Sequence, residues 1–345
     1  MKSVLVVIFS CLSILACTKP NALVDSKGPA PVSPSSGPAS FSSDGNGTQI
    51  FVSRQYVCRV KDGAARCFSV PSDRTARMTE LVLPENLGSI SKIFFPTMKS
   101  DLLLCAASAT KFSCWSYYYN DFSPANLDFK KPLPYSVPEG IGGGVFAYGY
   151  VGNGKHCALS KEMAKCWWDT DGRHSFRVVP LVSKSSASVI DMATTDFAVA
   201  ALLSDKTIEW ISEFPQNSRP DPKAPVQRVW TSFDWGCAWL DSGTFSCWGG
   251  KPEWYPPKEL KDVRMMTLTQ KGGCAGVKGA DQLQCWGEIP YIKAISSFKF
   301  RDIRDISSSK DSTDRLCVLT EHDAVACWDA GDVNQEYMVL YMPEY

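Results

Sequence analysis

Cysteines are the residues whose spacing most clearly indicates chemistry in this chain. Twelve of its 14 cysteines form six pairs whose members stand nine to eleven positions apart. The other two, Cys11 and Cys17, belong to the N-terminal segment discussed below. Such paired thiols can be oxidised to disulfides, and a tally that leaves none of the remaining twelve unpaired is typical of proteins that fold outside the cytosol. Zinc ligation and free buried thiols are the alternatives, and the lack of a Cys-x-x-Cys spacing disfavours zinc. The predicted bridges are Cys58–Cys67, Cys105–Cys114, Cys157–Cys166, Cys237–Cys247, Cys274–Cys285 and Cys317–Cys327.

A β-hairpin is the element that would bring each pair together. In the first pair, Asp62-Gly63 suits a two-residue turn in which Lys61 and Ala64 close the ladder. Counting outward, Cys58 and Cys67 then face each other at a position without direct hydrogen bonds, where Cα atoms approach most closely. That separation is within the range of a disulfide.

The hairpin is one unit of a repeat. A Cys, two apolar residues, a turn, a second Cys and an aromatic residue recur from positions 58, 105, 157, 200, 237, 274 and 317. The fourth copy is degenerate, with Ala200 and Glu209 at the cysteine places and Trp210 at the place of the recurring Trp. Successive copies begin 37 to 52 positions apart. Seven units with a period of this size are typical of propeller blades or solenoids. We expect Trp248 and its equivalents to pack in the core.

Two further short apolar runs accompany each hairpin. One precedes it, as in Ile90-Ser91-Lys92-Ile93, and another follows most copies beside a proline, as in Leu83-Pro84. Four strands per unit are therefore predicted, and no capped helical pattern persists. The predicted fold over residues 48–345 is all-β, a seven-bladed β-propeller of four-stranded blades with a cross-strand disulfide in six blades.

The N-terminal residues predict export and lipidation. Residues 1–16 read as a lipoprotein signal peptide, and Cys17 follows Ile14-Leu15-Ala16 as a lipidation site would. Residues 17–47 are rich in Pro, Ser and Gly and predict a tether. A plain signal peptide is the alternative, and the apolar run is too short for a transmembrane helix. We expect a lipid-anchored protein of a bacterial envelope, at the outer rather than the inner membrane, periplasmic or surface-exposed.

The repeats resemble a known family. Cys157-Ala158-Leu159 and Cys237-Ala238-Trp239 each precede a turn and Cys-Trp, with Gly249 and Gly287 after the Trp in two copies. This pattern resembles the repeats of the regulator of chromosome condensation family, above all its bacterial extracytoplasmic members. The resemblance implies a seven-bladed β-propeller. The Gly-Gln-Leu-Gly run usual in the family is missing, and no nucleotide-exchange residues match, so that activity is not implied.

Catalysis is not indicated by the remaining polar residues. His156, His174 and His322 belong to no metal or nucleophile motif, and His156 is expected to be structural. Carboxylates are plentiful, but no spacing singles out a pair. We expect no catalytic residue, metal or cofactor, and a hydrolase or lyase is only the third hypothesis. The 36 basic and 36 acidic residues balance, which disfavours nucleic acid as a partner.

Aromatic residues in the loops indicate a binding surface. With alternating strands, the hairpin turns emerge on one face and the other connections on the opposite face. Exposed aromatic loop residues are frequent at binding hot spots. A monomer that binds a protein partner is expected, and a carbohydrate or cell-wall ligand is the alternative. The candidate partner-binding residues are Tyr117, Tyr118, Tyr119, Phe122, Trp168, Trp235, Trp254 and Tyr255.

Overall fold

The computed structural model describes seventeen stretches of the chain, all within the compact unit Phe41–Tyr345. The predicted signal peptide, Cys17 and the tether lie outside them. The described residues are 48–53, 56–69, 79–84, 87–95, 102–117, 133–151, 155–160, 163–169, 176–180, 187–194, 198–212, 222, 224–300, 303–309, 315–320, 324–328 and 338–340.

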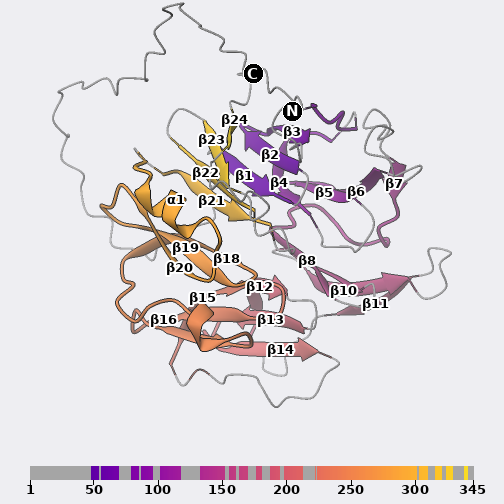
Figure 1. Cartoon of the computed structure of the whole chain (residues 1–345). Coiled ribbons are helices and arrows are strands. Elements are labelled where there is room, and N and C mark those ends of the chain that lie inside the picture. Colours follow the sequence, from indigo (N-terminus) through magenta and orange to yellow (C-terminus); the bar gives the residue numbers. More distant parts are fainter. Residues whose placement is uncertain are drawn as a thin grey trace, which may run out of the picture. The chain divides into compact units, whose positions relative to one another are not determined.

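Seven antiparallel sheets follow one another along the chain, and each is a blade (Figure 1). Blade 1 consists of β1 (Gln49–Val52), β2 (Tyr56–Lys61) and β3 (Ala64–Ser69). Blade 2 consists of β4 (Ile90–Phe94), β5 (Leu102–Ser108), β6 (Phe112–Tyr117) and β7 (Leu133–Tyr135). Blade 3 consists of β8 (Ala147–Val151), β9 (Lys155–Leu159), β10 (Ala164–Asp169) and β11 (Phe176–Pro180). Blade 4 consists of β12 (Val189–Thr194), β13 (Ala198–Leu203) and β14 (Ile208–Ser212), and blade 5 of β15 (Val226–Thr231), β16 (Gly236–Leu240) and β17 (Phe245–Trp248). Blade 6 consists of β18 (Val263–Thr269), β19 (Gly272–Val277) and β20 (Leu283–Gly287). Blade 7 consists of β21 (Asp305–Ser308), β22 (Leu316–Leu319), β23 (Val325–Trp328) and β24 (Met338–Leu340).

The blades form a closed ring around their first strands. In blades 3 to 7 each first strand contacts that of the next blade, and β21 of the last blade contacts β1 of the first. Apolar side chains fill the junctions, as where Val52 and Val57 pack against Leu319 and Val325. Among the described strands, those of blade 1 all come from the N-terminal part of the chain and those of blade 7 from the C-terminal part, and side-chain packing joins the two blades. The seven-bladed propeller is confirmed.

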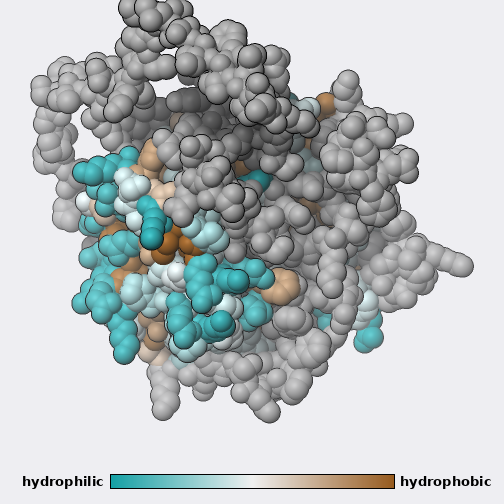
Figure 2. Space-filling model, viewed as in Figure 1, coloured by the Kyte–Doolittle hydropathy of each residue, from teal (hydrophilic) through white to brown (hydrophobic). Residues whose placement is uncertain are grey.

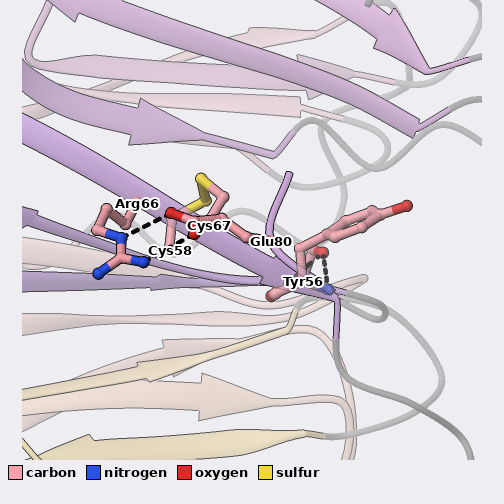
Figure 3. The surroundings of a disulfide bond; sticks show 6 residues. Tyr56, Cys58, Arg66, Cys67 and Glu80 are labelled. Atoms are coloured by element: carbon pink, nitrogen blue, oxygen red, sulfur yellow. Dashed lines mark hydrogen bonds and ion pairs between the residues drawn. A yellow bond between two sulfur atoms is a disulfide. The ribbon is translucent and has the colours of Figure 1, made fainter. Parts of the chain in front are cut away.

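All six predicted disulfides are present, each between the second and third strands of one blade. Their Cα atoms lie 4.0 to 4.1 Å apart, the short separation of pairs without direct hydrogen bonds. Figure 3 shows the first of them, Cys58–Cys67, beside the ion pair in which Arg66 Nε donates to Glu80 Oε1 at 2.6 Å. The hairpin register predicted from the turn is therefore confirmed.

Blade 4 departs from the predicted alignment by one residue. Ala200 faces Trp210 across β13 and β14, while Glu209 faces Ala201. Trp210, not Glu209, thus stands at the second cysteine's place, and its ring meets Trp248 of blade 5 edge to face at 4.7 Å. The assignment of Glu209 was wrong because the turn of this hairpin differs in length. A small residue opposite a large one fills the space that a disulfide occupies elsewhere.

Fourth strands are present in blades 2, 3 and 7, and blade 1 has an isolated bridge between Phe68 and Glu80 in the same place. Blades 5 and 6 differ from the expectation of four strands. After β17 the chain turns at Gly249 and Gly250, with φ of 65° and 58°, into the 3-10 helix η2 (Pro252–Trp254). After β20 it forms the short helix α1 (Ile292–Ser297).

The recurring aromatic residues are buried between blades, as predicted. Trp115, Trp167, Trp248, Trp286 and Trp328 are all at most 8% exposed. These rings fill the wedge between neighbouring sheets, which explains why an aromatic residue recurs at this place in every blade but blade 4, where Trp210 stands at the cysteine place instead. Among the helices of the described part, none is long and apolar enough to cross a membrane.

Candidate functional site

Trp235 is not part of a binding surface, contrary to the prediction. It lies in the loop between β15 and β16, and its side chain is fully buried at 0% exposure. Its indole Nε1 donates to the backbone oxygens of Thr269 at 3.1 Å and Gln270 at 3.0 Å, both in blade 6. The ring therefore fills the junction between blades 5 and 6, and a partner cannot reach it.

Trp254 and Tyr255 are half-buried and held in place. Lys251 Nζ lies 5.5 Å from the Trp254 ring centroid, and the Trp254 backbone oxygen accepts a hydrogen bond from Trp286 Nε1 at 2.8 Å. Tyr255 donates its hydroxyl hydrogen to the Gly249 oxygen at 2.6 Å. Both rings keep an exposed part in a fixed position, which reduces the entropy that binding would cost.

Trp168 is also half-buried and stands between two cations. Lys155 Nζ lies 4.8 Å and Arg177 Cζ 5.2 Å from its ring centroid. The remaining predicted residues are not tested, since Tyr118, Tyr119 and Phe122 lie outside the described residues and the side chain of Tyr117 is not described.

A second group of polar side chains occupies one register position of the first strands. In each blade this residue pairs two places beyond the first cysteine position, toward the hairpin turn, as where Lys92 pairs with Ala107 and Asp191 with Leu202. We call this set the axial ring. Its members in blade order are Gln49, Lys92, Ala147, Asp191, Arg228, Met265 and Asp305.

β-bulges set the direction of these side chains. The register shifts immediately before the axial position in blades 2, 4, 5 and 6. A bulge leaves one residue unpaired and turns the next side chain. The bulged residues are exposed and surround the axial ring on the hairpin face; they are Ser91, Ile190, Gln227 and Arg264.

The charged members converge although they come from separate blades. Lys92 belongs to blade 2, whose neighbours are blades 1 and 3. Its ammonium group nevertheless interacts electrostatically with Asp191, Asp305 and Arg228 of blades 4, 7 and 5. All four residues occupy the axial register position of their first strands, so their side chains come near enough to interact across the ring. Lys92 Nζ also donates to the Phe146 oxygen of blade 3 at 2.9 Å.

Burial makes these charges costly. It lowers the pKa of Lys92, and the two carboxylates oppose that shift. Burial raises the pKa of Asp191 and raises that of Asp305 to about 6, although Lys92 lowers both. Asp305 Oδ2 accepts from the Ile50 N–H at 2.9 Å, and Asp305 Oδ1 from the Ile306 N–H at 2.8 Å. Half-buried titratable groups of this kind cluster at functional sites.

Sequence reasoning missed the axial ring because it weighted aromatic loops on the opposite face. A signal was present, since the runs Ile90–Ile93, Val189–Met192, Val226–Val229 and Ile303–Ile306 all carry a charged residue at the third place. The alternation of side chains along a strand explains why each run carries one polar residue. Only the closed ring of blades brings the four charged side chains near one another.

His156 is structural, as predicted. It is 1% exposed, and its Nδ1 lies 2.6 Å from the Tyr148 hydroxyl oxygen. Burial lowers the pKa of His156 to about 4, so the imidazole is neutral at ordinary pH. Within the described ranges no group of three or more His, Cys, Asp or Glu side chains could hold a metal ion.

Comparison with known proteins supports the fold. No family model and no curated protein matches the sequence. The CRINKLY WD40 ectodomain of the Arabidopsis thaliana receptor kinase ACR4 is 15% identical over 83% of this chain and 96% of that one, with a TM-score of 0.50. Human WBSCR16 is 14% identical over 80% of this chain and 89% of that one, with a TM-score of 0.51. A structure of Kap60 bound to yeast RCC1 (Prp20) matches at a TM-score of 0.44, with 11% identity over 68% of this chain and 66% of that one. At such identities the likeness to the first two structures, with TM-scores of 0.50 and 0.51, shows the fold alone.

Proposed function

We propose that this chain is a non-enzymatic binding module whose propeller holds a protein partner at the axial ring. The observation that carries the proposal is that Lys92, Asp191, Arg228 and Asp305 share the axial register position of four blades and interact electrostatically across the ring. Two cations and two carboxylates complement the mixed charges of a polypeptide surface. A polyanion such as nucleic acid would favour an excess of cations.

The opposite face is a second candidate surface of the same function. Trp254 and Tyr255 present fixed, half-exposed rings there, and such aromatic residues contribute strongly at protein interfaces. A glycan is the alternative ligand of this face. Trp168 favours it, because an aromatic ring beside Lys155 and Arg177 suits stacking and charge pairing with an acidic sugar.

The cellular location is part of the same proposal. Export, lipidation at Cys17 and a flexible tether over residues 17–47 would place the propeller at the bacterial envelope, at the outer membrane in particular. Six disulfides support an oxidising compartment. A distant relationship to the regulator of chromosome condensation repeats is part of the proposal, and the Cys-Trp hairpins support it.

A crosslinking pull-down from intact envelope tests both surfaces. The natural chain is compared with a Lys92→Gln, Arg228→Gln double variant and with a Trp254→Ala, Tyr255→Ala double variant. Arg264→Gln is the matched control, because it removes an exposed cation beside the axial ring on the same face. Loss of one captured protein only in the first variant supports the axial site, and loss only in the second moves the site to the aromatic face. Equal capture by all forms rejects the proposal.

A further inference from the structure

Blade 5 ends at its third strand. In blades 2, 3 and 7 a fourth strand pairs with the third, whereas β17 (Phe245–Trp248) is the outer edge of its sheet. An edge strand presents backbone N–H and C=O groups to any extended chain that comes near. Blade 5 therefore offers an open edge within the described part of the protein.

The disulfide identifies the open backbone groups. The Cα atoms of Cys237 and Cys247 are 4.0 Å apart, so this pair has no direct hydrogen bonds and the N–H and C=O of Cys247 point outward. The same alternation turns those of Phe245 outward. No described residue hydrogen-bonds to these four groups. In blade 1 the equivalent Cys67 oxygen accepts from the Leu81 N–H at 2.8 Å.

The segment that follows β17 does not fill this edge. Gly249 and Gly250 have positive φ, and a Cβ at Gly249 would collide with the Asp234 oxygen, so the chain bends sharply there. Pro252, Pro256 and Pro257 then lack the N–H that a ladder needs. Blade 6 also ends at its third strand, but there α1 packs against β20. Covering an edge with a helix is a common protection.

One face of blade 5 carries aromatic side chains that are incompletely covered. Trp230 of β15, Trp239 of β16 and Phe245 of β17 form a triangle of half-buried rings, with each pair of centroids 6.4 Å apart, and Phe245 lies on the edge strand. The view of Figure 2 shows apolar patches among hydrophilic side chains over the part of the chain that Figure 1 draws in orange, which includes blades 5 and 6. An added strand would shield apolar surface as well as pair its backbone.

The other blades define what such a strand carries. Opposite the third-strand cysteine they place Leu81, Tyr135, Val179 and Met338. All four are apolar or aromatic. The equivalent position of blade 5 lies opposite Cys247, next to the place that faces Phe245 of the same strand, and suits a residue of the same kind.

We propose that β17 is a docking edge for an extended segment of a protein partner, which adds as the antiparallel fourth strand of blade 5 with an apolar residue opposite Cys247. Backbone hydrogen bonds supply affinity in this mode, and alternate side chains supply specificity. The β17 edge is separate from the axial ring. A failure of strand addition would therefore leave the proposed function unaffected, and a failure of the proposed function would leave strand addition unaffected.

Hydrogen exchange on the full chain is the first test. The amides of Phe245 and Cys247 should exchange freely, while that of Ser246, which is paired with Ala238, should be protected. Slow exchange of Phe245 and Cys247 in the free protein would mean that another part of the chain already covers the edge, and would overturn the proposal.

A peptide is the second test. The probe is an acetylated and amidated copy of the sequence of residues 176–182, which begins with the fourth strand of blade 3. With the residue equivalent to Val179 opposite Cys247, as Val179 pairs with Cys166 in blade 3, the residue two places further on in the probe stands opposite Phe245, and the probe should slow exchange at Phe245 and Cys247 at least tenfold. A copy that is N-methylated at these two residues of the probe should not, because their N–H groups would face β17. No protection at millimolar peptide, or equal protection by both peptides, would contradict strand addition.

A comparison of Phe245→Pro with Phe245→Ala separates the contribution of the Phe245 backbone N–H from that of its ring. Proline removes an N–H that serves no bond within the described sheet, and edge strands tolerate it. Phe245→Ala is the matched control, because it also loses the ring but keeps the N–H. The proline variant should bind the peptide at least tenfold more weakly than the alanine variant, whereas the Lys92→Gln, Arg228→Gln variant should bind it normally. Equal affinity of the two Phe245 variants would overturn the proposal.

Discussion

Asp305 Oδ2 accepts a hydrogen bond of 2.9 Å from the backbone N–H of Ile50, across the junction where the last blade meets the first. The two residues are 255 positions apart in the chain. Burial raises the pKa of the Asp305 carboxyl to about 6, and the N–H donors of Ile50 and Ile306 together with Lys92 offset only part of that effect. The junction that closes the ring of blades therefore contains a carboxyl group, that of Asp305, whose ionisation is unfavourable.

Asp305 should make the stability of the propeller depend on pH. Its folded-state pKa is raised, so the stability it contributes is fully present below pH 3.8 and is lost as pH rises through about 6. The free energy of unfolding of the natural chain should fall, relative to Asp305→Asn, by on the order of 2 kcal/mol between pH 4 and 7. Denaturant unfolding of both forms at the two pH values measures this, and parallel pH profiles would contradict it.

Lys92→Met should shift the titration of Asp305. The ammonium group of Lys92 lowers the pKa of Asp305 and that of Asp191. Without it, the pKa of Asp305 should rise above about 6. An NMR titration of the carboxyl carbons measures the change, with Arg264→Gln as a control that leaves it in place. An unchanged midpoint in Lys92→Met would show that the side chains do not converge at the axis.

The register of blade 4 predicts which cysteines would form a seventh bridge. Ala200 and Trp210 face each other as the cysteine pairs of the other blades do. Ala200→Cys with Trp210→Cys should therefore crosslink, as mass spectrometry of unreduced peptides would show. Ala200→Cys with Glu209→Cys, the pair that the sequence alignment suggests, should leave both thiols free. The opposite outcome would restore the alignment and reject the register.

Trp235 and Trp254 should respond differently to substitution. Trp235→Ala would empty a buried site and leave the Thr269 and Gln270 oxygens without their donor, at a cost of about 3–5 kcal/mol of stability. Trp254→Ala removes a half-exposed ring and should cost less than half as much. Thermal and denaturant unfolding give both values, and similar losses would mean that Trp254 also belongs to the core.

Local patterns in the sequence determined the repeating unit. The cysteine spacing and the Asp62-Gly63 turn predict the strand register, because neighbouring strands are joined by a short turn and side chains alternate with a period of two. The six disulfides, the buried Trp positions and the number of blades follow from that. The misplaced Glu209 shows the limit, since one extra turn residue shifts every later partner.

Long-range packing decided the rest. Lys92, Asp191 and Asp305 are far apart in the sequence, and only closure of seven blades brings their side chains to one axis. Burial of Trp235 likewise depends on blade 6 standing beside its loop. The open edge at Phe245 exists because the prolines and glycines after β17 send the chain elsewhere. A hairpin is specified by residues within a few positions of each other. The axial ring depends instead on which blades lie side by side, and the open edge depends on whether a later segment of the chain pairs with β17.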